Sequence, residues 1–304
     1  DRAGCYRHGM STQPFGTVLT TMITPFDESG AVDYQAMWDL ARHLVSHGSD
    51  GLVVCGTTVE SPTLTNEEKL TLFRTVVEAV GERAVVIAGT GTYDTAESVE
   101  TTRRAAEIGC DGVMAVTPYY SKPPQEGLFQ HFTAIADASD LPVLVYNIPG
   151  RTIRLIEVET LARLSHHERI VATKDAVEDI EFTRRTLAEV SETFAVYSGQ
   201  DSFTLPMMEI GAVGIVSVAS HLVGKQIAEM ATAARDKEFE AARVIHDRLM
   251  PLFESLFVEP NPMPLKGALS ELWRPVGDPR LPLIPAQPET VAGVLAALEA
   301  AEAA

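Results

Sequence analysis

The stretch IVATK, residues 170–174, is a short apolar run that ends in a lysine. A run of this kind is typical of a strand that is buried on both faces. A lysine at its end is costly to bury unpaired, unless the side chain extends its charge into water. Two questions therefore decide the role of Lys174. The first is which kind of sheet contains this strand, and the second is whether the side chain points into the protein or into solvent.

Seven further apolar runs resemble this one, and they follow one another at roughly thirty residues, the length of a strand–helix–strand unit. Segments between them, such as 33–48 and 66–81, have helical periodicity and end at a glycine, as helices commonly do. Strands that alternate with helices form a parallel sheet, and eight such units close a (β/α)₈ TIM barrel. The seven runs cover residues 17–26, 51–56, 84–91, 112–118, 142–149, 194–199 and 214–220.

The barrel is predicted to span residues 10–222, and a C-terminal helical lobe is predicted at 223–304. Within this lobe, the prolines of EPNPMP (259–264) should separate one helix from the next. Residues 1–9 precede Met10, which looks like a natural start, and are interpreted as a leader or an expression-derived extension. An open doubly wound sheet is the competing fold, but GTGTYD (89–94) lacks the third glycine of a dinucleotide-binding turn and follows the third run.

The composition of the chain excludes several classes of function. Of its 304 residues, 45% are hydrophobic and 22% are charged, as in soluble globular proteins. A net charge of −18 argues against nucleic acid and against an anionic membrane surface. No apolar run reaches the about 18 residues of a membrane span. Cys5, Cys55 and Cys110 are too scattered for a disulfide framework or a zinc site, so a cytoplasmic location is the simplest.

Lys174 is the candidate catalytic residue, because active sites of TIM barrels lie at the C-terminal ends of the strands. It is the one lysine of six that ends a predicted strand. If it points into the barrel, desolvation lowers its pKa and leaves a fraction of neutral amine, which attacks a ketone or aldehyde to form a Schiff base. Tyr146, Tyr120 and the Thr58 hydroxyl are candidates to pass protons during this chemistry.

Two further groups at the strand ends can bind carboxylates. The hydroxyls of Thr57 and Thr58 and the backbone amides after them form one such group, and the guanidinium of Arg151 forms the other. Each residue also has a simpler interpretation, since tyrosines often lie in cores, arginines often lie on surfaces, and a Gly-Thr-Thr sequence can be a capped turn. Their convergence on one rim of the barrel predicts an active site.

These motifs are similar to those of a known family. GTTVESPTL, VTPYYSKPPQEGL, YNIPGRT, VATKDA, YSGQDS and EPNPMPLK, in this order, resemble the dihydrodipicolinate synthase family of pyruvate-dependent class I aldolases. The resemblance extends from Gly16 to about Pro285. It implies that pyruvate condenses with L-aspartate 4-semialdehyde to give 4-hydroxy-tetrahydrodipicolinate, the first committed step of diaminopimelate and lysine synthesis. It also implies a homotetramer of two tight dimers, with no metal and no organic cofactor.

The resemblance further implies roles for individual residues, beginning with the Schiff base between Lys174 and pyruvate. Tyr146 would be the main proton-transfer residue, linked through Thr58 to Tyr120, which would reach across a dimer interface into the neighbouring site. Thr57 would hold the pyruvate carboxylate together with Thr58. The remaining implied substrate contacts are Arg151, for the semialdehyde carboxylate, and Gly199 and Val216.

Val59 departs from the family pattern, in which Gly-Thr-Thr is followed by a glycine. Glycine in such a turn usually serves a positive φ, which a β-branched residue tolerates poorly. We therefore expect either a different loop or strain at Val59. The neighbouring Thr57 and Thr58 would be affected first, so an altered substrate preference or a catalytically impaired site are both consistent with this change.

A second departure concerns feedback inhibition. Lysine-inhibited members of the family have a pocket at the dimer interface that contains histidine and asparagine residues. A cation at Lys69 should disfavour a lysine ligand by like-charge repulsion, which predicts weak or absent lysine inhibition. The matching positions of this possible allosteric pocket are Ser61, Asn66, Lys69, Tyr93, Glu97 and Tyr119.

Three functions remain open from the sequence. The first is the synthase, and the second is a sister aldolase, either an N-acetylneuraminate lyase or a 2-keto-3-deoxy sugar acid aldolase. Such aldolases keep the lysine and the tyrosine, but generally lack an arginine where this chain has Arg151. The third is a catalytically silent sensor or scaffold, which would not form an adduct with pyruvate on Lys174.

Overall fold

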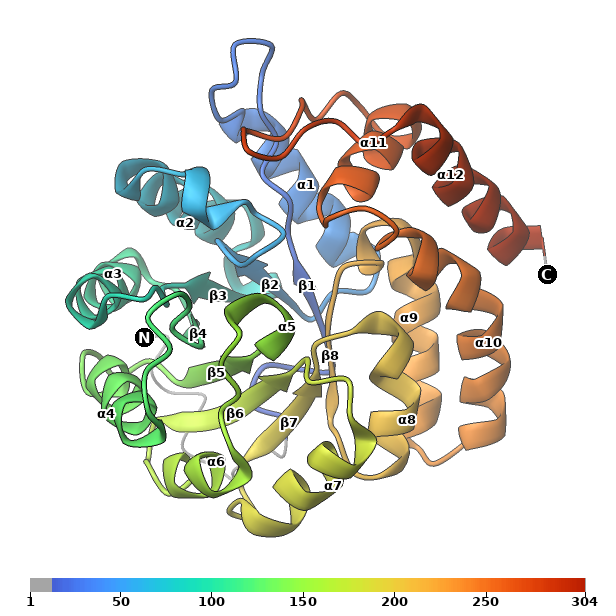
Figure 1. Ribbon diagram of the computed structural model, residues 1–304. Helices are drawn as coiled ribbons and strands as arrows, with labels where there is room; N and C mark the ends of the chain where they lie inside the picture. The colour runs from blue at the N-terminus through green and yellow to red at the C-terminus, as the bar shows by residue number, and fades with distance from the viewer. Residues whose placement is uncertain (1–12, 304) are drawn as a thin grey trace.

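The computed structural model describes residues 13–303 and forms a closed barrel of eight parallel strands in chain order, with helices around it (Figure 1). β8 pairs with β1 and closes the barrel. Both the TIM barrel and the eight predicted strands are confirmed, because each apolar run coincides with one strand, and only β6 extends past its run, by one residue. The strands are β1 Val18–Thr21, β2 Gly51–Val54, β3 Val85–Gly89, β4 Gly112–Val116, β5 Val143–Asn147, β6 Ile170–Asp175, β7 Ala195–Ser198 and β8 Gly214–Ser217.

Helices follow the strands, as the alternating pattern predicts, and three short 3-10 helices lie in the loops. The α-helices are α1 Tyr34–Ser46, α2 Asn66–Val80, α3 Thr95–Ile108, α4 Gln125–Ala136, α5 Pro149–Thr152, α6 Val158–Leu164, α7 Ile180–Glu189, α8 Thr204–Glu209, α9 Ser220–Arg235, α10 Phe239–Ser255, α11 Met263–Leu272 and α12 Pro288–Ala303. The 3-10 helices are η2 Ser61–Thr63, η3 Gly81–Arg83 and η4 Asp201–Phe203.

Local signals in the sequence fix where the first two helices begin. The carboxylate of Asp33 accepts the Ala36 amide at 2.9 Å and caps α1. Thr65 and Glu68 form a capping box at the start of α2, in which each side chain accepts the other residue's amide. These caps satisfy backbone donors that have no partner inside the helix.

The buried side chains form two layers. One layer fills the space between the strands and the surrounding helices, and the other fills the interior of the barrel. Because side chains alternate along a strand, every second residue points inward. Ala172 belongs to the interior layer, so Lys174, two residues further along β6, also points into the barrel.

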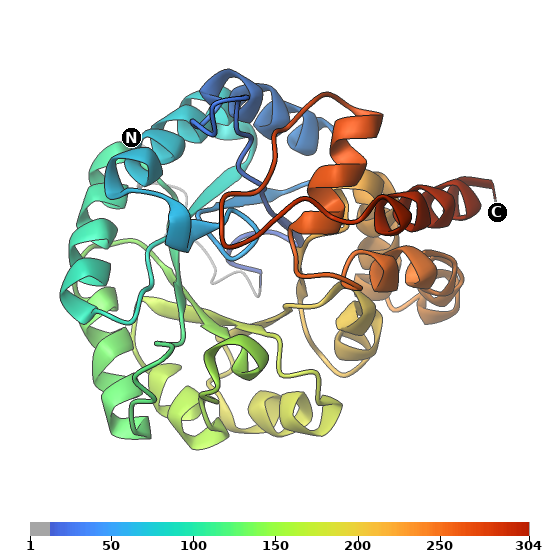
Figure 2. The same cartoon turned by 45° about the horizontal axis from the view of Figure 1, so that its top comes forward.

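The C-terminal helices pack on one side of the barrel (Figures 1 and 2). α9 contacts α1 and β1, α10 packs on α9, and α12 packs on α10 and α11. The predicted boundary at 222–223 falls inside α9, where Val223 has non-helical dihedral angles (φ −127°, ψ 38°). The predicted break at EPNPMP is confirmed, because α10 ends at Ser255 and α11 begins at Met263.

Two sequence-based predictions concern the ends of the chain and the membrane. Residues 1–9, interpreted above as an extension, lie outside the described part of the chain. Between residues 13 and 303, no helix combines the length and the apolar character needed to cross a membrane.

Candidate active site

Lys174 lies at the C-terminal end of β6 and is 3% exposed. Its register partner on β5 is Tyr146, and the Lys174 Nζ lies 4.1 Å from the centroid of the Tyr146 ring. The amine is therefore packed against an aromatic face inside the barrel. It does not extend into water, as a lysine at a strand end ordinarily does.

The surroundings of Lys174 disfavour its charged form. Burial lowers the pKa of Lys174 from 10.5 to about 7; the charge of Arg151 lowers it too, whereas the carboxylate of Asp201 opposes the shift. A lysine with this pKa is substantially unprotonated near neutral pH. It can therefore act as a nucleophile toward a carbonyl carbon.

Tyr146 is shifted in the opposite sense. Burial raises the pKa of the Tyr146 phenol to about 12, while a hydrogen bond with the Thr57 side chain and the charge of Arg151 oppose the rise. The phenol thus keeps its proton at neutral pH. It can donate that proton to a developing negative charge and recover it later, which is the behaviour of a general acid and base.

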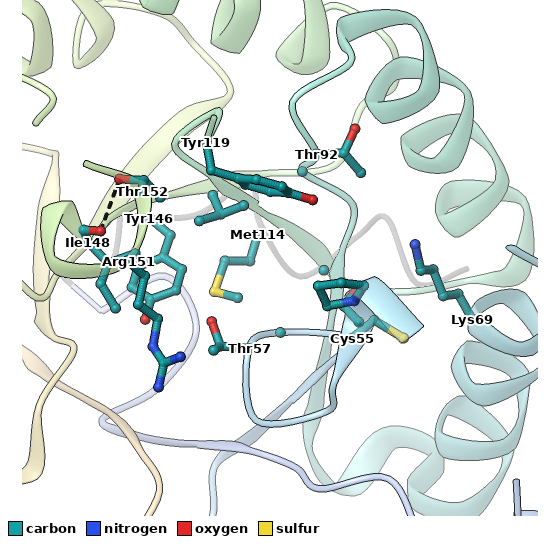
Figure 3. A pocket seen from close by; sticks show the side chains of 16 residues that line it. Cys55, Thr57, Lys69, Thr92, Met114, Tyr119, Tyr146, Ile148, Arg151 and Thr152 are labelled. Atoms are coloured by element: carbon teal, nitrogen blue, oxygen red, sulfur yellow. Dashed lines mark hydrogen bonds between the residues drawn. The ribbon is translucent and has the colours of Figure 1, made fainter. Parts of the chain in front are cut away.

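The two threonines after β2 have different partners from those predicted. The expected link ran from Tyr146 through Thr58, but the side chain that lies beside the phenol is that of Thr57 (Figure 3). The Thr58 Oγ1 instead accepts a hydrogen bond from Asn261 Nδ2 at 2.9 Å. The hydroxyl that hydrogen-bonds to Tyr146 is therefore that of Thr57, and the described partner of the Thr58 hydroxyl is Asn261.

A cavity of about 220 Å³ opens above Tyr146 at the mouth of the barrel (Figure 3). It joins residues of the predicted site, among them Thr57 and Arg151, to Lys69 of the predicted allosteric pocket. Lys174 is not among the lining residues, but its amine packs on the ring of Tyr146, which is one of them. The complete lining consists of Cys55, Gly56, Thr57, Ser61, Pro62, Lys69, Gly89, Gly91, Thr92, Met114, Val116, Tyr119, Tyr146, Ile148, Arg151 and Thr152.

Arg151 belongs to the single turn α5, and buried polar side chains hold this turn in place. Thr152 donates to the carbonyl oxygen of Ile148 at 3.0 Å. Asn147, at the end of β5, forms two hydrogen bonds with the backbone of Ile156, both at 3.0 Å. In Figure 3 the guanidinium of Arg151 lies on the same side of the cavity as Thr57 and Tyr146.

Three other predicted residues do not line the cavity. Tyr120 is 93% exposed and has a φ of 70°, so its ring extends away from Lys174 of the same chain. Gly199 follows β7, and its amide donates to the Asp175 carbonyl at 2.7 Å. Val216, on β8, belongs to the interior layer of the barrel.

Three of the six residues of the predicted allosteric pocket, Ser61, Lys69 and Tyr119, line the cavity. The Tyr93 and Tyr119 rings meet edge to face, with their centroids 5.2 Å apart. Burial, and the neighbouring Tyr93 and Glu97, raise the pKa of Tyr119. Lys69 is buried, and no carboxylate within residues 13–303 forms an ion pair with it. Ser61 begins η2, and Asn66 is the exposed first residue of α2.

The loop after β2 is arranged differently from the expectation for Val59. Among the described residues of this loop, Cys55 and Glu60 adopt a positive φ, of 64° and 60°, and Val59 does not. Of the two alternatives expected for this position, strain at Val59 is excluded, and a loop that differs from the family pattern stays a prediction. Val59 is fully buried, and its carbonyl oxygen accepts a hydrogen bond from Thr24 at 2.8 Å.

Sequence reasoning gave no role to several polar residues near the strand ends. Glu60 and Lys266 form a buried ion pair at 3.1 Å, and Asp201 is buried close enough to Lys174 to influence its pKa. Asn261 and Lys266 belong to the motif EPNPMPLK, and Asp201 belongs to YSGQDS. These motifs supported the family resemblance, but nothing in the spacing of their residues indicated which groups they would contact.

Schiff-base chemistry needs a free amine and a proton donor, and Lys174 and Tyr146 provide both where TIM barrels carry their active sites. This combination defines the class of the protein, a Schiff-base-forming lyase. The chain belongs to the dihydrodipicolinate synthetase family, whose model matches residues 14–301.

Similar proteins support this assignment. The 4-hydroxy-tetrahydrodipicolinate synthase of Heliobacterium modesticaldum is 51% identical over 94% of this chain and 95% of its own length. The synthase of the same name from Synechococcus elongatus is 52% identical over 91% of this chain and 93% of its own. A crystal structure of dihydrodipicolinate synthase from Bacillus anthracis has a TM-score of 0.91 at 47% identity, and covers 94% of this chain and 98% of that one. A crystal structure of the enzyme from Cyanidioschyzon merolae with lysine bound has a TM-score of 0.93 at 45% identity. The match covers 95% of this chain and 99% of that one.

Proposed function

We propose that this chain catalyses the reaction for which its relatives are named, the synthesis of 4-hydroxy-tetrahydrodipicolinate from pyruvate and L-aspartate 4-semialdehyde. The observation that carries this proposal is the desolvated amine of Lys174 beside the Tyr146 ring. Identities of about one half with the named synthases support the same reaction. The cavity above Tyr146 provides the place for the second substrate.

The reaction begins with pyruvate. The lone pair of Lys174 Nζ attacks the ketone carbon, and loss of water gives a Schiff base whose protonated nitrogen withdraws electrons. The methyl carbon then loses a proton and becomes the nucleophilic carbon of an enamine. Tyr146 accepts and returns the protons of these steps, and Thr57 exchanges protons with it through their hydrogen bond.

The second substrate enters the cavity from solvent. The enamine carbon attacks the aldehyde carbon of L-aspartate 4-semialdehyde and forms the new carbon–carbon bond. The amine of the added portion then attacks the Schiff-base carbon, closes the ring and displaces the Lys174 amine. Arg151 binds the carboxylate of this substrate, because its planar guanidinium can donate two parallel hydrogen bonds. Gly199 and Val216 complete the substrate contacts.

Assembly and location form part of the same proposal. The chain forms a homotetramer of two dimers, in which Tyr120 reaches into the neighbouring site and passes protons there. The exposure of its ring, 93%, and its positive φ support an aromatic side chain held outward for a partner. As an enzyme of diaminopimelate and lysine synthesis, it acts in the cytoplasm. Sedimentation equilibrium gives the mass of the assembly and tests this part directly.

A panel of second substrates tests the proposed reaction. With pyruvate present, L-aspartate 4-semialdehyde should be consumed at least a hundredfold faster than sugar aldehydes or N-acetylmannosamine. Arg151→Ala should remove most of this preference by raising KM for the semialdehyde, whereas an exposed arginine far from the cavity, replaced in Arg184→Ala, should leave it unchanged. Faster turnover of a sugar aldehyde would identify a sister aldolase instead.

A further inference from the structure

The C-terminal lobe contacts the loop after β2 at Thr58, the residue next to Thr57 of the cavity lining. Asn261 lies between α10 and α11, and its Nδ2 donates to Thr58 Oγ1 at 2.9 Å, although 203 residues separate them. Asn261 is 5% exposed and Thr58 is 1% exposed. A hydrogen bond with both partners out of water is stronger than an exposed one, and breaking it is correspondingly costly.

The backbone of this loop is fixed independently of Asn261. The Glu60 carboxylate binds Lys266 Nζ at 3.1 Å and accepts the Arg280 amide at 2.8 Å. On the other side, Thr24 donates to the Val59 carbonyl. Figure 2 shows the segment after α11 next to this loop. Because these contacts hold the backbone, the contact with Asn261 governs the orientation of one side chain, that of Thr58.

The direction of the hydrogen bond determines what Thr58 can do. An amide nitrogen only donates, so the Thr58 oxygen is the acceptor, and the single Thr58 proton remains available for another group. Within residues 13–303 no acceptor takes this proton. A buried donor without an acceptor is unfavourable in the free protein, and a carboxylate is the acceptor that would satisfy it best.

The side-chain amide of Asn261 forms fewer hydrogen bonds than that of Asn147, an asparagine that stabilises the fold. Asn147 uses both of its amide atoms, binding the Ile156 carbonyl and the Ile156 amide. The Oδ1 of Asn261 is buried and has no hydrogen-bond partner among the described residues. Buried polar atoms are usually paired, so Asn261 leaves an amide oxygen free for a further partner while its nitrogen orients Thr58.

We propose that Asn261 is a positioning residue for substrate binding: by donating to Thr58 Oγ1, it directs the Thr58 proton toward the carboxylate of the keto acid. This inference rests on the proposed function only in that pyruvate is the keto acid. Asn261 does not touch the reacting atoms, and it acts through Thr58.

Three variants test the inference by reversing or removing this hydrogen bond. In Asn261→Asp the carboxylate can only accept, so it should take the Thr58 proton away from the substrate and raise KM for pyruvate by about tenfold. Asn261→Ala leaves the hydroxyl undirected and should raise KM about threefold. Thr58→Val removes the hydroxyl and should match Asn261→Asp. In the two Asn261 variants, kcat and KM for the second substrate should stay within about twofold, because Asn261 does not touch the reacting atoms.

A double-mutant cycle separates positioning from a purely structural role. When Thr58→Val is already present, Asn261→Asp should cause no further rise in KM, because residues that act through one another are not additive. A matched amide-to-acid change at an exposed helix position, Gln130→Glu, is expected to leave KM unchanged. Melting temperatures identify any variant whose fold is affected. If Asn261→Asp is destabilised, Asn261→Ala and its double-mutant cycle with Thr58→Val test the inference in its place.

A binding measurement with pyruvate alone tests the role of Asn261 separately from the identity of the second substrate. The pyruvate concentration that gives half-maximal trapping by borohydride measures pyruvate binding without any second substrate. The predicted increase for Asn261→Asp should appear there too, even if the semialdehyde is not the natural partner. An unchanged half-maximal concentration in both Asn261 variants, or additive effects with Thr58→Val, would overturn the inference.

Discussion

The amine of Lys174 lies 4.1 Å from the centroid of the Tyr146 ring, and both side chains are buried at register-paired positions of β5 and β6. The same burial shifts their proton affinities in opposite directions. The pKa of Lys174 falls to about 7, whereas that of Tyr146 rises to about 12. Near neutral pH the pair can therefore provide a free amine and a protonated phenol at once. Schiff-base formation needs both a nucleophile and a proton donor.

The dependence of kcat/KM for pyruvate on pH should reflect this lysine. The reactive form is unprotonated, so kcat/KM should rise with pH, reach half of its plateau at about pH 7 and level off about one unit higher. Because the phenol of Tyr146 has a pKa of about 12, its ionisation should cause no decrease below about pH 11. Initial rates in a constant-ionic-strength buffer series measure this profile. An ascending limb centred near 10, the ordinary range of lysine, would show that the amine is not desolvated.

Thr57, and not Thr58, should affect proton transfer through Tyr146. Thr57→Val removes the hydroxyl that lies beside the phenol and should lower kcat by about tenfold or more, whereas Thr57→Ser keeps the hydroxyl and should retain most of the activity. Tyr146→Phe should lower kcat by about a hundredfold or more. Steady-state kinetics with both substrates measure these effects. If Thr58→Val lowered kcat and Thr57→Val did not, the order of the hydroxyls in this turn would be the opposite of the one described.

The ion pair between Glu60 and Lys266 should contribute to stability by holding the C-terminal lobe against the loop after β2. Lys266→Met leaves a carboxylate buried without its cation and should lower the free energy of unfolding by about 3 kcal/mol. The double variant Glu60→Gln with Lys266→Met should lose less than the sum of the two single variants. Urea unfolding followed by circular dichroism measures these values.

A surface ion pair provides the control for that experiment. Arg184 and Glu181 approach to 3.4 Å on α7, but both side chains are mostly exposed, and Arg184→Ala should change stability little. Equal effects of Lys266→Met and Arg184→Ala would show that the buried pair does not hold the lobe.

Feedback inhibition by lysine should be weak in this protein. Lys69 is a buried cation that lines the cavity, and it repels the ammonium groups of a lysine ligand. We expect half-inhibition only above about 1 mM lysine, which corresponds to a weak binding energy. Lys69→His, which removes most of this charge at neutral pH, should lower that concentration. Half-inhibition of the unmodified protein at submillimolar lysine would contradict the prediction.

The sequence was sufficient to predict the barrel and the position of its lysine. Eight apolar runs separated by helical segments have few arrangements other than a closed (β/α)₈ barrel. Because side chains alternate along β6, Lys174 points into the barrel if Ala172 does. Both inferences depend on local periodicity and on the rule that active sites of this fold lie at the strand ends.

The connections within the site were harder to predict, because they depend on dihedral angles and on distant residues. Which of two adjacent threonines faces Tyr146 is determined by the loop that carries them. The left-handed residues of this loop are Cys55 and Glu60, not the position that departs from the family pattern. The partners of Glu60 and Thr58 follow more than 200 residues later in the chain. No pattern within the loop itself indicates contacts at that separation.

Reductive trapping of pyruvate tests the role of Lys174 most directly. Incubation with pyruvate and borohydride, followed by peptide mass spectrometry, should show one pyruvate-derived addition per chain, on the peptide that contains Lys174. Trapping should be lost in Lys174→Ala and retained in a variant of an exposed lysine, Lys237→Ala. Complete modification of Lys174 that also abolishes activity is the result we predict. An unmodified Lys174 at saturating pyruvate, or an adduct on another lysine, would contradict the Schiff-base mechanism.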